Sequence, residues 1–142
     1  MVRISSVLGR LTMHAFLIAS AAFALGLCAG HVWIQRWDEL YAAGMLISGA
    51  CLTFVLMRTY GEGHKLTGSA TSDDARKTAG QFVWSCVFFA MISSMFGMSL
   101  SGIIWHSADF LRTFGLIFWG VITAVAVYPV RRDAKRLAAK AR

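Results

Sequence analysis

The chain has 142 residues, of which 57% are hydrophobic and 15% are charged. Soluble domains have roughly 45–50% apolar and about 25% charged residues, so this composition excludes an ordinary soluble domain. The length leaves little chain for a catalytic domain, and the net charge of +7 comes without the aromatic platform or reading helix of a nucleic-acid-binding protein. We therefore expect a small integral membrane protein whose partner is the lipid bilayer and not nucleic acid.

Four segments without a charged residue follow one another along the chain: residues 11–30, 40–57, 81–104 and 113–130. About 20 apolar residues in a helix cross a hydrocarbon core of roughly 30 Å, and in lipid a helix satisfies its backbone polar groups internally. Transmembrane β-strands would alternate over about ten residues, and these segments do not alternate. The sequence predicts an all-α polytopic membrane protein, a single domain over 1–142 with four transmembrane helices in one bundle.

The start of the chain resembles a secretory signal peptide, because Arg3 and Arg10 precede an apolar run that ends in small residues. Cys28 stands where a lipoprotein would carry its acylated cysteine. Leu27 before it is not a small residue, however, so the cleavage motif is incomplete. We expect the first segment to be retained as a membrane anchor.

The connections between the segments are of two kinds. Residues 31–39 and 105–112 are short, so each joins an antiparallel pair of helices, and we expect two tandem helical hairpins. Residues 58–80 are longer and polar, with a centre that we expect to be flexible. Four residues ahead of the third segment are candidates to cap a short helical lead into it: Thr71, Ser72, Asp73 and Asp74.

The basic residues are distributed unevenly. Twelve of the 14 lie before the first segment, in residues 58–80 or after the last segment, whereas the short connections hold only Arg36 and Arg112. By the positive-inside rule, both termini are expected in the cytoplasm, with the chain in the cell inner membrane.

A helical continuation of the last segment would place Leu137 and Ala138 on one side of a basic strip. Such strips attract anionic headgroups by about 1 kcal/mol per basic residue, although a role in topology alone would also explain the charges. The candidate contacts for anionic lipid are Arg131, Arg132, Lys135 and Arg136.

Aromatic residues gather at both ends of the predicted helices. Trp33, Trp37, Tyr41 and Trp105 lie toward the outer ends, and Tyr60, Trp84 and Tyr128 lie toward the inner ends. Amphipathic rings at these depths form an aromatic belt, unless some of them fill helix contacts.

The two halves of the chain align with a shift of 71 residues. Six identical pairs keep this register: Ala19 with Ala90, Gly26 with Gly97, Asp38 with Asp109, Leu40 with Leu111, Gly44 with Gly115, and Gly49 with Gly120. The pattern indicates an internal repeat, with units of about 11–58 and 81–132. Because both units start on the same side, the repeat is parallel, about an axis along the membrane normal.

Small residues recur four apart in both halves, at Ala22, Gly26 and Gly30 and again at Ser93, Gly97 and Ser101. Such stripes let helix backbones approach closely in lipid. The first and third helices then pack against each other, or either stripe faces a second copy. The candidate packing residues are Gly26, Gly30, Gly97, Ser101, Gly44, Gly49, Gly115 and Gly120.

Few side chains in the predicted helices point to chemistry. No Asp, Glu, Lys or Arg lies in any of the four segments, which argues against a proton-coupled exporter. His31 and His106 lie at similar depth at the outer ends of their helices, where both can be plain interfacial residues. The alternative is a soft metal site or a haem site, with Cys28, Met45 or Met98 nearby. We expect no metal and no cofactor.

The remaining reactive side chains are unremarkable in their spacing. His14 is expected to bond a hydroxyl or a backbone carbonyl. Cys28, Cys51 and Cys86 form no CxxC pair and are expected to be small buried hydrophobes. The chain contains no Ser-His-Asp set, phosphate loop or HExxH motif, so we expect no enzyme.

A set of motif residues recurs in both halves of the chain. The second half carries Gly97-Met98, Asp109, Phe114, Gly120 and Arg132-Asp133, and the first half carries Gly26-Leu27, Asp38, Tyr41, Gly49 and Arg58. Together they resemble the YiaA/YiaB two-helix-domain inner-membrane proteins. The chain departs from the family pattern at Arg58-Thr59, where Arg-Asp is expected, and at Cys28 and Ser99, where Trp is common. The resemblance implies a bacterial inner-membrane protein without an established activity.

These observations favour a non-enzymatic membrane protein that acts through helix packing, as an accessory or assembly subunit or as a homo-oligomer. Its partner would be a second copy or another membrane protein. The alternatives are a small channel or transporter and, second, a metal- or haem-binding redox subunit.

Overall fold

A computed structural model describes residues 2–35, 38–67, 73–106 and 109–140. These residues form four α-helices: α1 (Val2–Gln35), α2 (Glu39–Thr67), α3 (Asp73–Trp105) and α4 (Phe110–Lys140). Each helix is long and apolar enough to cross a membrane, and each contains one of the four charge-free segments. The predicted all-α fold with four membrane-length helices is therefore confirmed.

An aspartate directly precedes each of α2 and α4, at Asp38 and Asp109. The Asp38 carboxylate accepts a hydrogen bond from the Leu40 N–H at 2.9 Å, and the Asp109 carboxylate accepts one from the Arg112 N–H at 2.8 Å. Each satisfies a backbone donor that the first turn of a helix leaves without a partner. A side-chain cap thus begins both α2 and α4.

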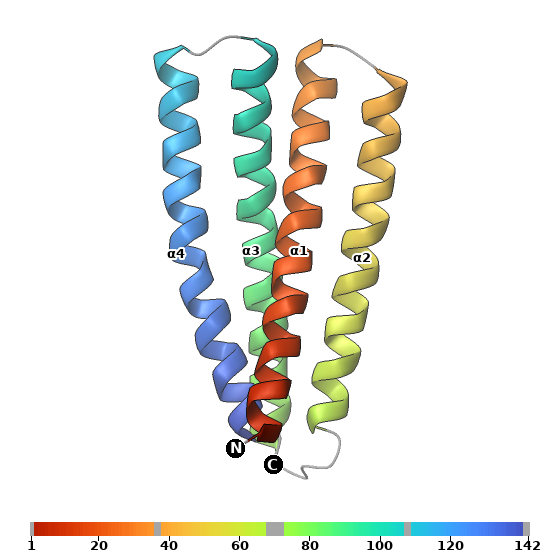
Figure 1. Ribbon diagram of the computed structural model, residues 1–142, viewed down its shortest axis with the longest axis vertical. Helices are drawn as coiled ribbons and strands as arrows, with labels where there is room; N and C mark the ends of the chain where they lie inside the picture. The colour runs from red at the N-terminus through yellow and green to blue at the C-terminus, as the bar shows by residue number, and fades with distance from the viewer. Residues whose placement is uncertain (1, 36–37, 68–72, 107–108, 141–142) are drawn as a thin grey trace.

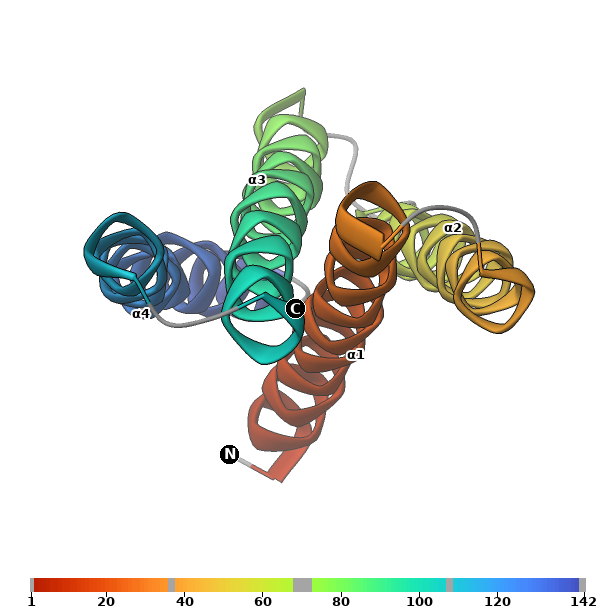
Figure 2. The same ribbon diagram turned by 90° about the horizontal axis from the view of Figure 1, so that it is seen from above.

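The helices form a central pair with one flanking helix on each side. α1 and α3 share the most extensive interface, α2 packs on the outer side of α1, and α4 packs on the outer side of α3 (Figures 1 and 2). α1 begins and α4 ends at the lower end in Figure 1, which we call the basic end. Its described basic side chains are Arg10, Arg58, Lys65, Arg76, Lys77, Arg131, Arg132, Lys135 and Arg136.

The central pair supplies most of the buried side chains. Leu11, Ile18 and Ala22 of α1 and Phe82 and Cys86 of α3 lie in one apolar core. In α2, by contrast, only Thr59 and Gly63 are buried among the described residues. The flanking helices therefore present long apolar faces outward, as helices surrounded by lipid do.

The helices run well beyond the charge-free segments at the basic end. α1 has 34 residues and is about 51 Å long, compared with a hydrocarbon core of roughly 30 Å. Residues 58–67 continue α2 and residues 73–80 begin α3, so most of the polar connection is helical. The expected helical lead into the third segment is confirmed from Asp73. The expected flexible centre, with Thr71 and Ser72, lies outside the described residues.

The C-terminal tail is part of this extension. Leu137 is 0% exposed, and Ala134 and Ala138 are also buried in the same cluster as Val7 and Leu11. The apolar side of the basic strip therefore packs inside the protein and not on the bilayer surface. The helix continues because its apolar residues, spaced three and four apart, are covered by neighbouring helices.

Candidate functional site

The closest contacts of the described glycines lie at the crossing of α1 and α3. A Cβ atom added to Gly26 would overlap the backbone carbonyl oxygen of Ser94, and one added to Gly97 would overlap the carbonyl oxygen of Phe23. Both contacts are therefore backbone against backbone, which only glycine permits. Gly30 lies against Ser101 in the same interface, so all four candidate packing residues of α1 and α3 meet within one chain.

These contacts are reciprocal. Gly26 meets Ser94, and Gly97 meets Phe23. The two glycines are 71 residues apart, and so are Phe23 and Ser94, so the two contacts are equivalent under the shift of 71. Gly30 and Ser101, also 71 apart, contact each other directly. Such pairing is what a two-fold relation between α1 and α3 produces.

The four candidate glycines of the flanking helices divide into two kinds. A Cβ on Gly44 would lie 2.9 Å from Cys28 Sγ, and one on Gly120 would lie 3.4 Å from the Phe96 ring, so these two glycines lie in helix contacts. Gly49 and Gly115 would meet no described atom within 4 Å. A Cβ at either position would therefore lie in open space within one chain.

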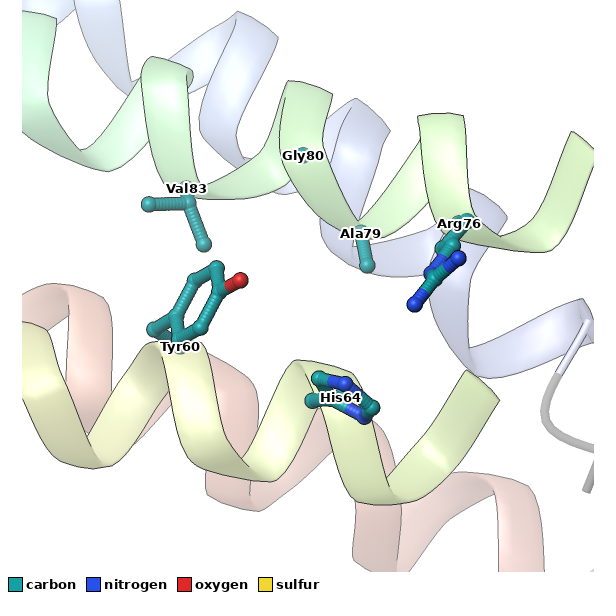
Figure 3. A pocket seen from close by; sticks show the side chains of 6 residues that line it. All are labelled: Tyr60, His64, Arg76, Ala79, Gly80 and Val83. Carbon is teal, nitrogen blue, oxygen red and sulfur yellow. The ribbon is translucent and has the colours of Figure 1, made fainter. Parts of the chain in front are cut away.

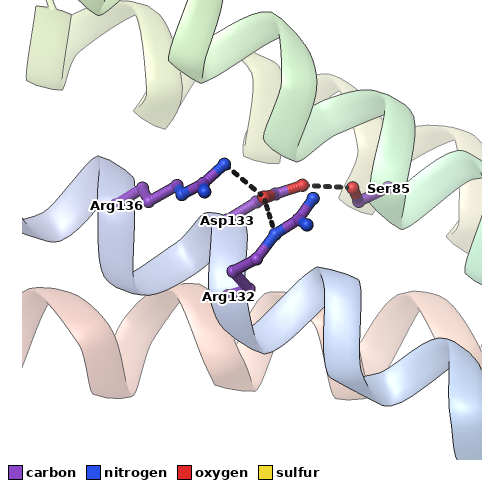
Figure 4. Close-up of polar contacts among 4 residues, drawn as sticks. All are labelled: Ser85, Arg132, Asp133 and Arg136. Carbon is purple, nitrogen blue, oxygen red and sulfur yellow. Dashed lines mark hydrogen bonds and ion pairs between the residues drawn. The ribbon is translucent and has the colours of Figure 1, made fainter.

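A buried carboxylate joins α3 and α4 near the basic end (Figure 4). Asp133 is 4% exposed, and Ser85 Oγ donates a hydrogen bond to its Oδ2 at 2.6 Å. Arg132 Nε donates to Oδ1 at 3.1 Å, and an Arg136 guanidinium nitrogen lies 4.0 Å from the same oxygen. Because a buried charge is costly without partners, this cluster determines how the start of the tail sits on α3.

Sequence reasoning missed this cluster. Ser85 lies inside a charge-free segment, and Asp133 was noted only beside Arg132 in a family motif. The four tail residues proposed to contact lipid are exposed, but Arg132 and Arg136 also pair with Asp133. Arg131 and Lys135 point away from the core on the same helix, so the basic side of the strip stays on the surface.

A histidine and two aromatic rings close the opposite end of the bundle. His31 of α1 is 5% exposed, its ring stacks on Tyr41 at a centroid distance of 3.5 Å, and the Trp105 ring meets it edge-on at 4.5 Å. His31 Nε2 lies 3.8 Å from Asp38 Oδ2. Tyr41 and Trp105 thus fill a contact among α1, α2 and α3. For these two residues the structure favours helix packing, which was the alternative to a place in the aromatic belt.

The structure does not join the two histidines proposed as a site. His31 is enclosed by Tyr41 and Trp105, whereas His106 is exposed at the end of α3. Among the described residues, no group of three or more His, Cys, Asp or Glu is placed to hold a metal ion. Trp33 is exposed, as expected for a belt residue, and Trp37 lies outside the described part of the chain.

The three cysteines are free and differ in their surroundings. Cys86 is buried in the core and Cys28 is half-buried against Gly44, as expected for small apolar residues. Cys51 is exposed on α2, so the expectation of burial is wrong for this cysteine. It lies on the outward side because the other helices pack along only one side of α2.

His14 is buried, but its Nδ1 has no hydrogen-bond partner among the described residues.

Cavities lie in the grooves on either side of the central pair. One of about 340 Å³ lies between α2 and α3 near the basic end, lined by Tyr60, His64, Arg76, Ala79, Gly80 and Val83 (Figure 3). Two apolar hollows of about 420 and 190 Å³ follow the groove between α1 and α4, and they share Phe16, Ala19 and Phe89. Of these three cavities among the described residues, the one between α2 and α3 alone combines a cation, an imidazole and a phenol.

Comparisons with protein-family models, with curated proteins and with solved structures each gave no match.

Proposed function

We propose that this chain is a non-enzymatic integral membrane protein that acts through helix packing, as a homo-oligomer or as an accessory subunit of a larger membrane complex. The observation that carries the proposal is the pair of outward glycines, Gly49 on α2 and Gly115 on α4, where an added Cβ would meet no described atom within 4 Å. A glycine inside a helix costs about 1 kcal/mol relative to alanine. At the α1–α3 crossing a close contact offsets that cost, and on the flanking helices a second protein would do so.

The geometry of the crossing favours this function over transport between the central helices. Backbone contacts at Gly26 and Gly97 leave no space between α1 and α3 at that level. A channel or transporter would have to place its path elsewhere, and flux into proteoliposomes above that of empty vesicles would favour this alternative.

The proposal includes the architecture expected from the sequence. We propose two tandem hairpins that arose by duplication, in a bacterial inner-membrane protein similar to the YiaA/YiaB family. The reciprocal contacts of Gly26 and Gly97, and the aspartate caps at Asp38 and Asp109, support the duplication, since both pairs are 71 residues apart. The charge of the basic end supports cytoplasmic termini.

The experiment is a measurement of association in membranes. We expect wild-type protein in mild detergent and in lipid nanodiscs to form a defined oligomer, or to retain a partner from its native membrane. Gly49→Leu and Gly115→Leu should weaken that association, because a leucine side chain holds the approaching helix away. Gly61→Leu is the matched control, since Gly61 also meets no described atom within 4 Å but lies on α2 beyond the charge-free segment.

Native mass spectrometry and cross-linking would provide the readout. A monomer at every protein-to-lipid ratio, with no protein retained from native membranes, would overturn the proposal. So would an oligomer that tolerates both outward glycine substitutions as well as it tolerates Gly61→Leu.

A further inference from the structure

We infer that the cavity between α2 and α3 binds the headgroup of an anionic phospholipid. This site is separate from the basic strip of the tail and from the outward glycines, so the inference goes beyond the proposed function. It requires only that the basic end of the bundle lies at a bilayer surface.

The polar side chains that line the cavity include one cation and two rings that can form hydrogen bonds. The guanidinium of Arg76 on α3 and the imidazole and phenol rings of His64 and Tyr60 on α2 converge on it (Figure 3). The two rings also meet edge-on, with centroids 6.4 Å apart. A guanidinium forms strong, directional hydrogen bonds with phosphate oxygens, and a phenol or an imidazole supplies further donors. The polar lining therefore suits a phosphate group.

The cavity lies at the depth of lipid headgroups. The charge-free segments end at Met57 and begin at Gln81, so Tyr60 and Arg76 lie about 4.5 and 7.5 Å outside the hydrocarbon core at 1.5 Å per residue. A bilayer of roughly 40–45 Å around a core of roughly 30 Å leaves about 5–8 Å for headgroups on each side. Tyr60 and Arg76 thus lie at the depth of lipid phosphates, whereas His64 lies about 10.5 Å outside the core, on the water side of that layer.

The other side of the cavity is apolar and points into the membrane. Ala79 and Val83 form this wall, and Val83 belongs to the charge-free segment of α3. A free phosphate ion would gain nothing from such a wall, whereas the glycerol and first acyl carbons of a lipid would be buried there. The change from polar to apolar lining therefore selects an amphiphile. The volume of about 340 Å³ also falls within the range of small-molecule sites, roughly 300–1,000 Å³.

The equivalent groove across the bundle lacks this lining. The nearest hollow between α1 and α4 has a volume of about 190 Å³, and Arg131 is the only charged residue among those that line it. The two grooves therefore differ in chemistry, although the helices that form them are arranged alike. We expect one bound lipid per chain, at the groove between α2 and α3.

Gly80 provides a steric test of the site. It lines the cavity, and a Cβ added to it would meet no described atom within 4 Å, so a larger side chain fits without displacing the helices. Gly80→Leu fills the cavity, keeps every charge and favours the helix. Gly61→Leu is the matched control outside the cavity. Arg76→Gln and its neighbour Lys77→Gln, which does not line the cavity, form a second pair with equal loss of charge.

The experiment is native mass spectrometry of the full chain in mild detergent, titrated with phosphatidylglycerol or with phosphatidylcholine of the same acyl chains. We expect one phosphatidylglycerol to bind in preference to phosphatidylcholine. Arg76→Gln should weaken it about tenfold, as loss of a charged hydrogen bond does, and Lys77→Gln by at most about fivefold. Gly80→Leu should abolish binding, and Gly61→Leu should preserve it.

Several results would overturn the inference. Equal losses for Arg76→Gln and Lys77→Gln would show that only general surface charge attracts the lipid. Equal binding by Gly80→Leu and Gly61→Leu would show that the cavity is not the binding site. Equal binding of phosphatidylcholine would show that the anionic charge is not recognised. Displacement of the lipid by millimolar inorganic phosphate would show a simple anion site. The circular dichroism of each variant verifies its fold, and if Arg76→Gln misfolds, the glycine pair decides the question.

Discussion

The α1–α3 crossing makes a quantitative prediction for Gly26→Ala. The atoms nearest to the new methyl group are the backbone oxygen, carbonyl carbon and Cα of Ser94, and real Cβ atoms do not lie closer than about 3.0 Å to such atoms. No side chain can rotate away, so the two helices must separate. Overpacking in a tight interior typically costs about 1–3 kcal/mol. Alanine is also about 1 kcal/mol more favourable than glycine inside a helix, which offsets part of that cost. We expect a net destabilisation of about 1–2 kcal/mol.

The reciprocal contact adds a sharper test. Gly97→Ala should have a similar effect, because Gly97 meets the Phe23 carbonyl in the same way. A single separation of α1 and α3 relieves both clashes, so the double variant should lose less than the sum of the two single losses. Gly61→Ala, in open surroundings, should be neutral or slightly stabilising.

The assay is equilibrium unfolding in mixed micelles of mild detergent and dodecyl sulfate, followed by helical circular dichroism. Full additivity of the two substitutions would refute the idea of one shared crossing. A Gly26→Ala variant as stable as the wild type would refute the close contact itself.

Three further predictions concern other buried contacts, each measured by the same unfolding assay. Ser85→Ala removes the donor to a buried Asp133 oxygen and should cost about 1–3 kcal/mol; no loss would mean that the pair is dispensable. His31→Phe keeps the ring stack and removes a buried Nδ1 without a described partner, at the loss of the long contact between Nε2 and the half-exposed Asp38. Stability should therefore hold or rise, whereas a large loss would show that the Asp38 contact or another bond of the imidazole matters. Leu137→Ala should cost about 2–5 kcal/mol because the side chain is 0% exposed, and Lys135→Ala should be silent; equal effects would place the tail outside the core.

The sequence predicts the four membrane-length helices well because, in lipid, helix formation depends on the composition of the segment itself. A charge-free run must satisfy its backbone groups within itself, so composition alone indicates a helix. The same reasoning fails at the basic end, where residues 58–67 and 73–80 read as a polar connection yet are helical. There, helix formation depends on covering Thr59, Gly63 and Ala79 with other helices, and this pattern is too sparse to recognise along the chain.

The candidate site could be predicted in part. The shift of 71 residues pairs Gly26 with Gly97, and in the structure both glycines lie at the α1–α3 crossing with reciprocal contacts. It does not indicate that Ser85 would reach Asp133, since these residues are 48 apart and belong to different helices. It also does not indicate that Arg76 and His64 share one cavity, because that depends on how α3 tilts against α2.

Composition and charge were therefore sufficient for the helical class, the number of spanning segments and the separation of basic from apolar surface. These properties follow from the interaction of each segment with lipid and water. The tertiary structure alone distinguished Gly26, pressed against a backbone carbonyl, from Gly49, which faces outward. It also buried Asp133 and Leu137 in a tail that looks uniformly basic. The physical reason is that the contact of a segment with lipid and water depends on its own composition. The side chains that a residue touches depend instead on how the helices cross.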